Sequence, residues 1–222
     1  MVKKAILSGG SLTTDAVAKR VAQQTLAPRE AGYVDEVQRL LDAGLAVMLR
    51  AGTSSSPRVA DIVREAKLSN DAFYRHFASK EDLVAAIVEA GAARLVSYLR
   101  HQMTKGRSPQ AQLRRWIEGI MAQAGDPEVA EPTRAVLWNG SRTAGLPGGR
   151  GDTSHAPLAA LLIDPLTALG SDDAVRDASA VVQTVMGRMH ELLWQRTEPS
   201  QDDIEHLVAY CLAGVRRSGR VR

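Results

Sequence analysis

Apolar residues recur every three or four positions along almost the whole chain from Val34 onward, and this spacing constrains the fold more than any other feature. It places the apolar side chains on one face of a helix, because an α-helix has about 3.6 residues per turn. The first such stripe consists of Val34, Val37, Leu41, Leu45 and Met48. The sequence therefore predicts an all-α protein.

Composition excludes several other classes of protein. The 222 residues suffice for one large or two small domains, and 45% apolar residues are ordinary for a chain that buries a core. Cys211 is the only cysteine, so an intramolecular disulfide is impossible. No window reaches the roughly 20 apolar residues of a membrane-spanning helix. The apolar run after the basic start is too short for a signal peptide, so we expect a cytoplasmic protein with no membrane partner.

Residues 1–33 differ from the rest and are predicted to be a basic, partly disordered N-terminal extension. This extension could add contacts to DNA phosphates or remain a solvated tail. The whole chain has a formal net charge of +3 and a sequence pI near 9.2. That charge permits a nucleic-acid partner without requiring one.

Signals for two short helices follow Gly52 along the chain. Ser56 can cap a helix that has Pro57 at its first position, where a missing N–H group leaves no bond unmade. After a three-residue turn, Ser69 can cap a third helix over residues 70–76. Two short helices joined by such a turn form a helix-turn-helix.

The predicted third helix combines aromatic and basic side chains. Phe73 and Phe77 are four residues apart, so both can face the core. Tyr74, Arg75 and His76 lie between them and are therefore expected on the mostly outward surface of the helix. Hydrogen-bond donors on an exposed short helix suit contacts to DNA phosphates and base edges.

The N-terminal end of this helix would enter the major groove of DNA first. Asn70 can pair bidentately with adenine, and Asp71 can accept a hydrogen bond from cytosine. Ser79 opens a fourth helix, predicted to run to about residue 103, and Lys80 in its first turn can hold a phosphate. We therefore predict a DNA-binding site that consists of Ser56, Arg58, Ser69, Asn70, Asp71, Tyr74, Arg75, His76 and Lys80.

The stretch ADIVREAKLSNDAFYRHFASKEDLVAAIVE, residues 60–89, is similar to the signature of the TetR-type (tetracycline-repressor) family of bacterial transcriptional regulators. The resemblance covers residues 34–83. In that family the equivalents of Tyr74, His76 and Lys80 hold DNA phosphates, and the start of the recognition helix reads bases. The resemblance implies these roles for the same positions here.

Two positions depart from the pattern of the family. Lys67 stands where the family usually has Gly, so the turn either avoids a left-handed residue or carries about 1 kcal/mol of strain. Asn70 and Asp71 replace the more usual basic residue and Gly, and the acidic Asp71 disfavours nearby phosphates.

Residues 84–222 are predicted to form a larger helical domain for ligand binding and dimerisation. Asp126 and Pro127 form the start signal of one helix, and Pro165 is expected to bend or break another. Large, adaptable side chains that suit an apolar ligand cavity could line a pocket or belong to a plain core. These candidates are Trp116, Met121, Trp138, Met186, Met189 and Trp194, with Arg142 to meet an acidic group of the ligand.

The last two helices carry regular apolar seams, which could be monomer core or a dimer interface. A helix-turn-helix reads palindromic DNA as a dimer, and the last two helices form the interface in the resembling family. The predicted interface residues are Val175, Ala178, Val182, Val185, Met189, Leu192, Ile204, Leu207, Val208, Cys211 and Val215.

These features together predict a homodimeric transcriptional repressor that a small apolar effector releases from a palindromic operator. The alternative is a helical adaptor or scaffolding protein that has lost sequence-specific DNA binding. An enzyme is not expected, because no nucleophile or metal motif is present and the five His have no ligand spacing. We expect no cofactor and no metal.

Overall fold

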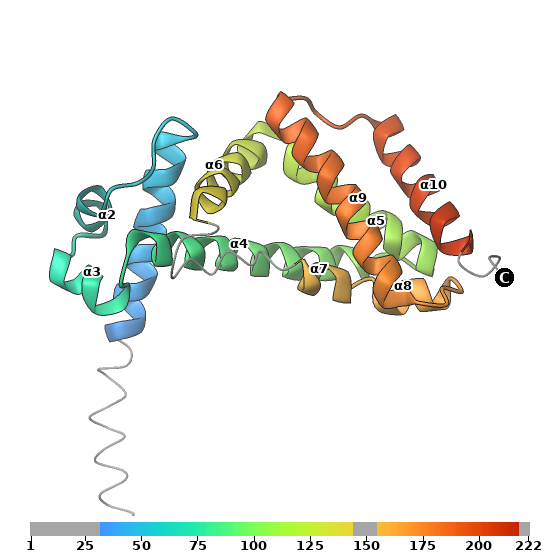
Figure 1. Cartoon of the computed structure of the whole chain (residues 1–222), viewed down its shortest axis with the longest axis horizontal. Helices are drawn as coiled ribbons and strands as arrows, with labels where there is room; N and C mark the ends of the chain where they lie inside the picture. Colours follow the sequence, from blue (N-terminus) through green and yellow to red (C-terminus); the bar gives the residue numbers. More distant parts are fainter. Residues whose placement is uncertain (1–31, 144–154, 218–222) are drawn as a thin grey trace, which may run out of the picture.

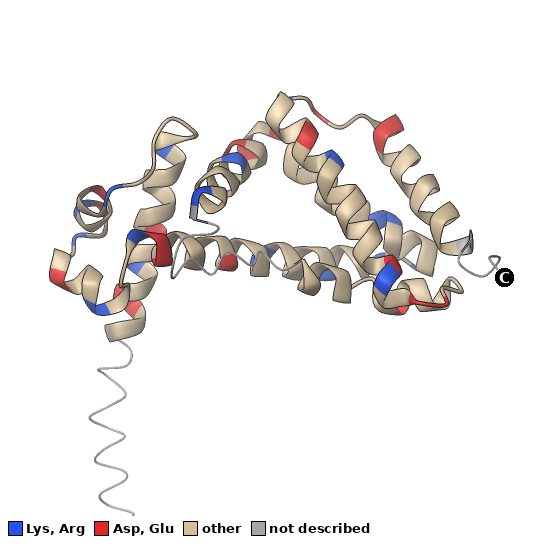
Figure 2. Cartoon of the chain, viewed as in Figure 1, with Lys and Arg blue, Asp and Glu red and all other residues tan. Residues whose placement is uncertain are grey.

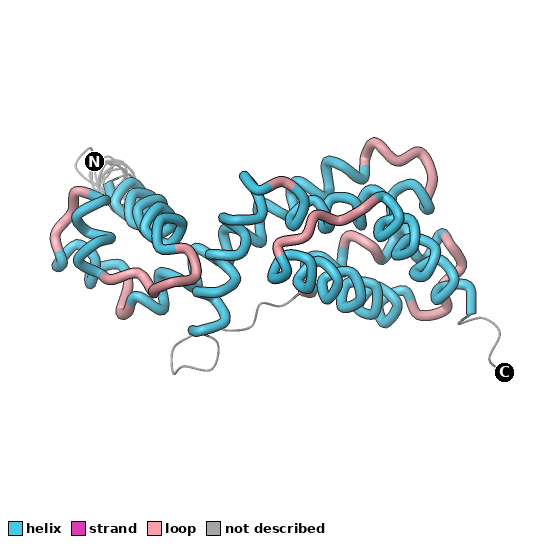
Figure 3. The backbone as a smooth tube through the Cα atoms, turned by 90° about the horizontal axis from the view of Figure 1, so that it is seen from above, coloured by secondary structure: helices cyan, strands magenta, loops and turns pink. Residues whose placement is uncertain are grey.

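The computed structural model describes residues 32–143 and 155–217, and within these ranges every regular element is a helix (Figures 1 and 3). The all-α prediction is therefore confirmed. The first helix, residues 32–51, is called the leading helix. The others are α2 (Val59–Ala66), α3 (Asn70–His76), α4 (Lys80–Met103), α5 (Pro109–Gly125), α6 (Pro127–Thr143), α7 (Ala156–Ala160), α8 (Ile163–Ala168), α9 (Ala174–Gln195) and α10 (Gln201–Arg217).

The first 31 residues of the predicted N-terminal extension lie outside the described residues, and Gly32 and Tyr33 are already helical. None of the described helices combines the length and the apolar character needed to cross a membrane. Nor do the described residues bring three His, Cys, Asp or Glu side chains together in a group that could hold a metal ion.

The described chain has two apolar cores, one in a small head and one in a larger body. The head core extends from Leu40 to Ile87 and joins the leading helix, α2, α3 and the first turns of α4. Gly44 allows the leading helix to cross α4 closely, since a Cβ atom there would lie 2.8 Å from Ile87 Cδ1 and 2.9 Å from a Leu83 methyl group. Helix α4 then continues from the head into the body (Figure 1).

Serine side chains cap the starts of α3 and α4. The hydroxyl of Ser69 accepts from the Ala72 N–H at 3.1 Å, and that of Ser79 accepts from the Asp82 N–H at 3.1 Å. Both caps satisfy a backbone donor that the first helical turn leaves free. The predicted bounds of α3 and α4 are therefore confirmed.

The predicted start of the second helix is wrong by two residues. Helix α2 begins at Val59, and its N-cap is Arg58 rather than Ser56, without a capping side-chain hydrogen bond. Residues 55–58 have no regular secondary structure, with extended backbone at Arg58, and Pro57 is buried. Burial of Pro57 thus takes precedence over the local signal of a proline in the first helical turn.

The turn after α2 adopts the left-handed alternative at Lys67, which has φ 55° and ψ 44°. The Leu68 N–H donates to Val63 O at 2.9 Å and the Lys67 N–H to Arg64 O at 3.2 Å, which is the Schellman pattern of a helix end. Nη2 of Arg39 donates to Ala66 O at 2.5 Å and to Lys67 O at 3.1 Å. These bonds hold a residue other than glycine in a conformation that costs about 1 kcal/mol.

Helix α5 occupies the centre of the body, in contact with α4, α6, α8, α9 and α10. Asp126 caps α6 as predicted, with Oδ1 accepting from the Glu128 N–H at 2.9 Å. The predicted bend or break in this segment is present, but it lies at Leu161 and Leu162, between α7 and α8, rather than at Pro165 itself. Pro165 is the third residue of α8, where its missing N–H group would have no helical partner.

Two arginines tie α10 to its neighbours. The guanidinium of Arg114 on α5 donates to both carboxylate oxygens of Glu205, at 2.5 and 2.7 Å. Arg188 on α9 donates to Asp203 at 2.6 Å. Hydrogen bonds from Ser200 and from Arg188 lower the pKa of Asp203 to about 2. These charged hydrogen bonds fix α10 against α5 and α9.

Candidate nucleic-acid interface

Helix α3 exposes polar side chains to solvent, while aromatic side chains in and after it pack into the head core. Phe73 is fully buried in the head core, and Phe77 is partly buried against it. Asn70 and Asp71 at the start of α3 are exposed, and Tyr74 is 59% exposed. The fold therefore leaves free the side chains that a groove-reading helix needs, on a helix held in place by Phe73.

Glu36 on the leading helix contacts the side chains of Arg75 and His76 at the C-terminal end of α3. Its Oε2 accepts from Arg75 Nη1 at 2.9 Å and from His76 Nε2 at 2.7 Å. The ring of Tyr33 packs edge-on against His76 with the ring centroids 5.1 Å apart. The hydrogen bond from His76, together with the charge of Arg75, lowers the pKa of Glu36 despite the opposing effect of partial burial.

The expected outward position of His76 is wrong. Its side chain is only 5% exposed, whereas that of Arg75 is 45% exposed. The reason is a tertiary one, since Glu36 and Tyr33 hold the imidazole against the leading helix. Helical spacing alone cannot reveal this contact, because Glu36 and His76 are 40 residues apart in the sequence.

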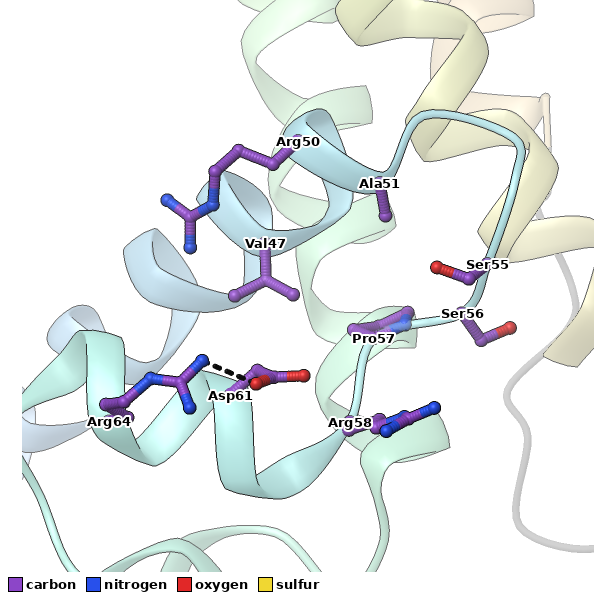
Figure 4. A pocket seen from close by; sticks show the side chains of 9 residues that line it. All are labelled: Val47, Arg50, Ala51, Ser55, Ser56, Pro57, Arg58, Asp61 and Arg64. Carbon is purple, nitrogen blue, oxygen red and sulfur yellow. Dashed lines mark hydrogen bonds and ion pairs between the residues drawn. The ribbon is translucent and has the colours of Figure 1, made fainter.

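A cleft of about 290 Å³ lies between the leading helix, residues 55–58 and α2 (Figure 4). Arg50, Arg58 and Arg64 line it, and we call it the arginine cleft. Glu65 pairs with Arg50 at 2.7 Å, and Asp61 pairs with Arg64 at 2.6 Å. Unlike Arg50 and Arg64, Arg58 has no ion pair with any described residue.

The remaining predicted phosphate contacts, Ser56 and Lys80, line a second cleft of about 160 Å³ between head and body. Asn139 and Arg142 of α6 line the same cleft, which we call the junction cleft. Lys80 lies 3.7 Å from Glu81. Helix α6 therefore reaches the head at the start of α4, an adjacency that sequence reasoning missed.

The candidate ligand-pocket residues separate into three groups. Trp116, Met121, Met186 and Met189 are buried together in the body core. Trp138 and Arg142 form a pair on α6, with the guanidinium 4.9 Å from the ring centroid. The third group is Trp194, which is 47% exposed and therefore does not share a buried site with the first group.

Among the described residues, three buried polar atoms of the body have no hydrogen-bond partner. They are Nε1 of Trp116, Nε2 of His190 and Nη1 of Arg134, the last of which forms an ion pair with Glu131 at 2.6 Å. Burial lowers the pKa of His190, and the nearby His155 adds to that effect. Unpaired polar atoms in a core are unusual and commonly mark a place with a function.

The seam predicted to face a second copy instead packs inside the protomer. Val175 is 65% exposed and Ile204 is partly buried, but the other nine predicted residues are buried in the body core. Helix α9 lies against α5, α7 and α8 and so uses its apolar stripe within the chain. The opposite faces of α9 and α10 are exposed and include Trp194 and Tyr210.

Charge on the head is mixed rather than uniformly basic (Figure 2). Clustered positive charge attracts DNA phosphates strongly. A head of mixed charge has no such cluster, so its binding to DNA would depend on a few individually positioned cations. The head has a small core of its own and a short exposed helix that presents hydrogen-bond donors. This combination is typical of helix-turn-helix DNA-binding folds.

The comparisons with known proteins place the chain within this class. Residues 40–87 match the family described as bacterial regulatory proteins, tetR family, and the head core begins and ends at the same residues. The resemblance to the TetR-type family is therefore confirmed, since the head carries the amino-terminal domain of that family. No curated protein matches the chain.

Solved structures of transcriptional regulators share the fold of most of the chain. A protein of Pseudomonas aeruginosa PAO1 assigned as a transcriptional regulator is 23% identical, with 84% of this chain and 93% of that chain covered and a TM-score of 0.64. A transcriptional regulator of Rhodococcus sp. Rha1 is 18% identical, with 82% of this chain and 96% of that chain covered and a TM-score of 0.61. A TetR-family transcriptional regulator of Streptomyces coelicolor is 20% identical, with 84% of this chain and 89% of that chain covered and a TM-score of 0.58. The chain thus has the fold of a TetR-family transcriptional regulator.

Proposed function

We propose that the protein is a sequence-specific DNA-binding repressor of the cytoplasm that acts as a homodimer and leaves its operator when a small apolar effector binds. The observation that carries this proposal is α3, a capped helix that exposes Asn70, Asp71, Tyr74 and Arg75 over a buried Phe73. An adaptor without DNA binding would have no need to keep polar donors on a helix fixed so firmly.

The contacts to DNA divide into two kinds. Tyr74, Arg58, Ser56 and Lys80 supply donors for phosphates, which set position and salt dependence. Ser69, Asn70, Asp71 and Arg75 lie at or on α3 and set the preference for particular base pairs. His76 supports this surface from its position against the leading helix.

The dimer uses the outward faces of α9 and α10, opposite the seams that pack in the protomer. These faces carry small residues together with the large side chains of Trp194 and Tyr210, which are 47% and 60% exposed. Two copies paired through them would form a four-helix interface and place two heads about 34 Å apart for a palindrome.

Helix α6 provides a route from the body to the head. Arg134 on α6 is 5% exposed and donates from Nε to Leu193 O of α9 at 2.9 Å. The C-terminal part of α6 lines the junction cleft with Lys80. An effector that enters the body beside the unpaired indole N–H of Trp116, with any acidic group near Arg142, would displace α6 and tilt the heads. It releases DNA only if it binds the DNA-free state more tightly.

Selection of random duplex DNA on the purified protein at near-physiological salt tests the proposed function. We expect enrichment of a palindrome, because two identical heads read two inverted half-sites. Tyr74→Phe should then weaken binding to all sequences alike, since it removes a phosphate donor. Binding that is salt-sensitive and blind to sequence, or absent, would contradict the proposal and favour the adaptor.

A further inference from the structure

Glu36 connects the leading helix to Arg75 and His76 at the C-terminal end of α3. One carboxylate oxygen accepts from Arg75 Nη1 at 2.9 Å and from His76 Nε2 at 2.7 Å. The side chain of Glu36 is 28% exposed, and that of Arg75 is 45% exposed. The contact therefore lies at the rim of the surface that the proposed function assigns to DNA.

This arrangement leaves Arg75 only partly available. A guanidinium has five N–H donors in a fixed fork, so Arg75 can keep one bond to Glu36 and direct others outward. Its charge, however, already has an anionic partner. A phosphate that approaches Arg75 from outside also approaches the Glu36 carboxylate, which repels it.

An anionic partner such as the Glu36 carboxylate weakens non-specific binding to DNA more than specific binding. Non-specific binding arises almost entirely from cations that neutralise phosphates, whereas specific binding adds hydrogen bonds to base edges. A carboxylate paired with Arg75 thus weakens binding to any sequence, while the base contacts that the proposed function gives to Asn70 and Asp71 remain.

We propose that Glu36 is a specificity-determining positioning residue, which holds Arg75 and His76 against the leading helix and so restrains binding to non-operator DNA. This inference rests on the proposed function. Glu36 need not touch DNA itself, because it acts through the two side chains that it holds.

The test compares isosteric charge removals at two neighbouring positions. Glu36→Gln removes the carboxylate that contacts α3. Asp35→Asn makes the same change in net charge one residue earlier, where the carboxylate lies 3.7 Å from Arg39 and has no recorded contact with α3. Fluorescence anisotropy in a salt series gives the affinity of each full-length variant for a random-sequence duplex and for the selected operator.

We expect Glu36→Gln to raise affinity for the random-sequence duplex about fivefold, as the loss of a surface ion-pair partner permits. The slope of log affinity against log salt should steepen by about 0.9, the value for one additional phosphate contact. Affinity for the operator should rise less, so the ratio of the two affinities falls. Asp35→Asn should leave that ratio unchanged.

A double-mutant cycle separates this role from a merely structural one. In an Arg75→Ala background, Glu36→Gln should no longer raise affinity for the random-sequence duplex. The inference is overturned if the two charge removals act equally, or if Glu36→Gln weakens binding to both DNAs. Melting temperatures of the variants show whether each one is folded. If the wild-type protein binds neither DNA even at low salt, the proposed function fails, and with it this inference.

Discussion

Truncation of Phe73 should unfold the head and leave the body intact. Phe73 is fully buried, and it is the only aromatic residue among the buried members of the head core. Its ring centroid lies 5.2 Å from that of Tyr74 and 5.9 Å from that of Phe77. Phe→Ala changes at fully buried sites destabilise by about 3–5 kcal/mol. That loss is a large fraction of the stability of any small domain.

Two optical signals separate the domains in a urea titration of Phe73→Ala. All three tryptophans, Trp116, Trp138 and Trp194, lie in the body, so their fluorescence reports the body alone. Far-UV circular dichroism reports the helices of both domains. With m near 1.5 kcal/mol per molar urea for a small domain, a loss of about 3 kcal/mol shifts the head midpoint by about 2 M. The fluorescence midpoint should stay where it is.

The matched control is Ile117→Ala, which removes a fully buried side chain from α5 in the body core. It should lower the fluorescence midpoint, because α5 is the central helix of the body. If Phe73→Ala instead shifts the fluorescence and dichroism midpoints by the same amount, the two cores unfold as one unit. The division into an independent head and body would then be refuted.

Three further predictions concern single residues. Lys67→Gly should raise the free energy of unfolding by about 0.5–1 kcal/mol, because glycine adopts φ 55° without strain; an unchanged or lower urea midpoint would count against the left-handed turn. The pKa of Asp203 falls from 3.8 to about 2 on folding, so its stabilisation is complete above pH 4 and is lost as the pH falls toward 2. Asp203→Asn should therefore flatten the decline of urea midpoints measured from pH 5 to pH 2, and an equally steep decline would refute this. Burial raises the pKa of Cys211 to about 11, so a thiol reagent at pH 8 should modify it only as α10 unfolds; reaction at the rate of an unfolded peptide would contradict its buried position.

Features decided by neighbouring residues could be predicted from the sequence. Ser69 and Ser79 each accept from an N–H group three residues later, so the caps and the bounds of α3 and α4 follow from local chemistry. Phe73 faces the core for an equally local reason, since a helix surface repeats every three to four residues.

Features decided by packing between distant segments could not be predicted. The start of α2 depends on the burial of Pro57, and the position of His76 depends on Glu36, 40 residues earlier. The apolar stripe of α9 was identified correctly as a packing surface, but its periodicity does not say whether the partner is α5 or a second copy. The DNA contacts, the ligand pocket and the dimer faces remain predictions for the same reason.

The most direct test of the central claim is a repeated DNA selection with Asn70→Ala beside the wild-type protein. Asn70 is the first residue of α3 and is exposed, so it should read a base rather than hold a phosphate. We predict that the variant enriches the same palindrome with preference lost at one base pair in each half-site. An unchanged consensus, or a uniform loss of affinity like that of Tyr74→Phe, would contradict base reading by the start of α3.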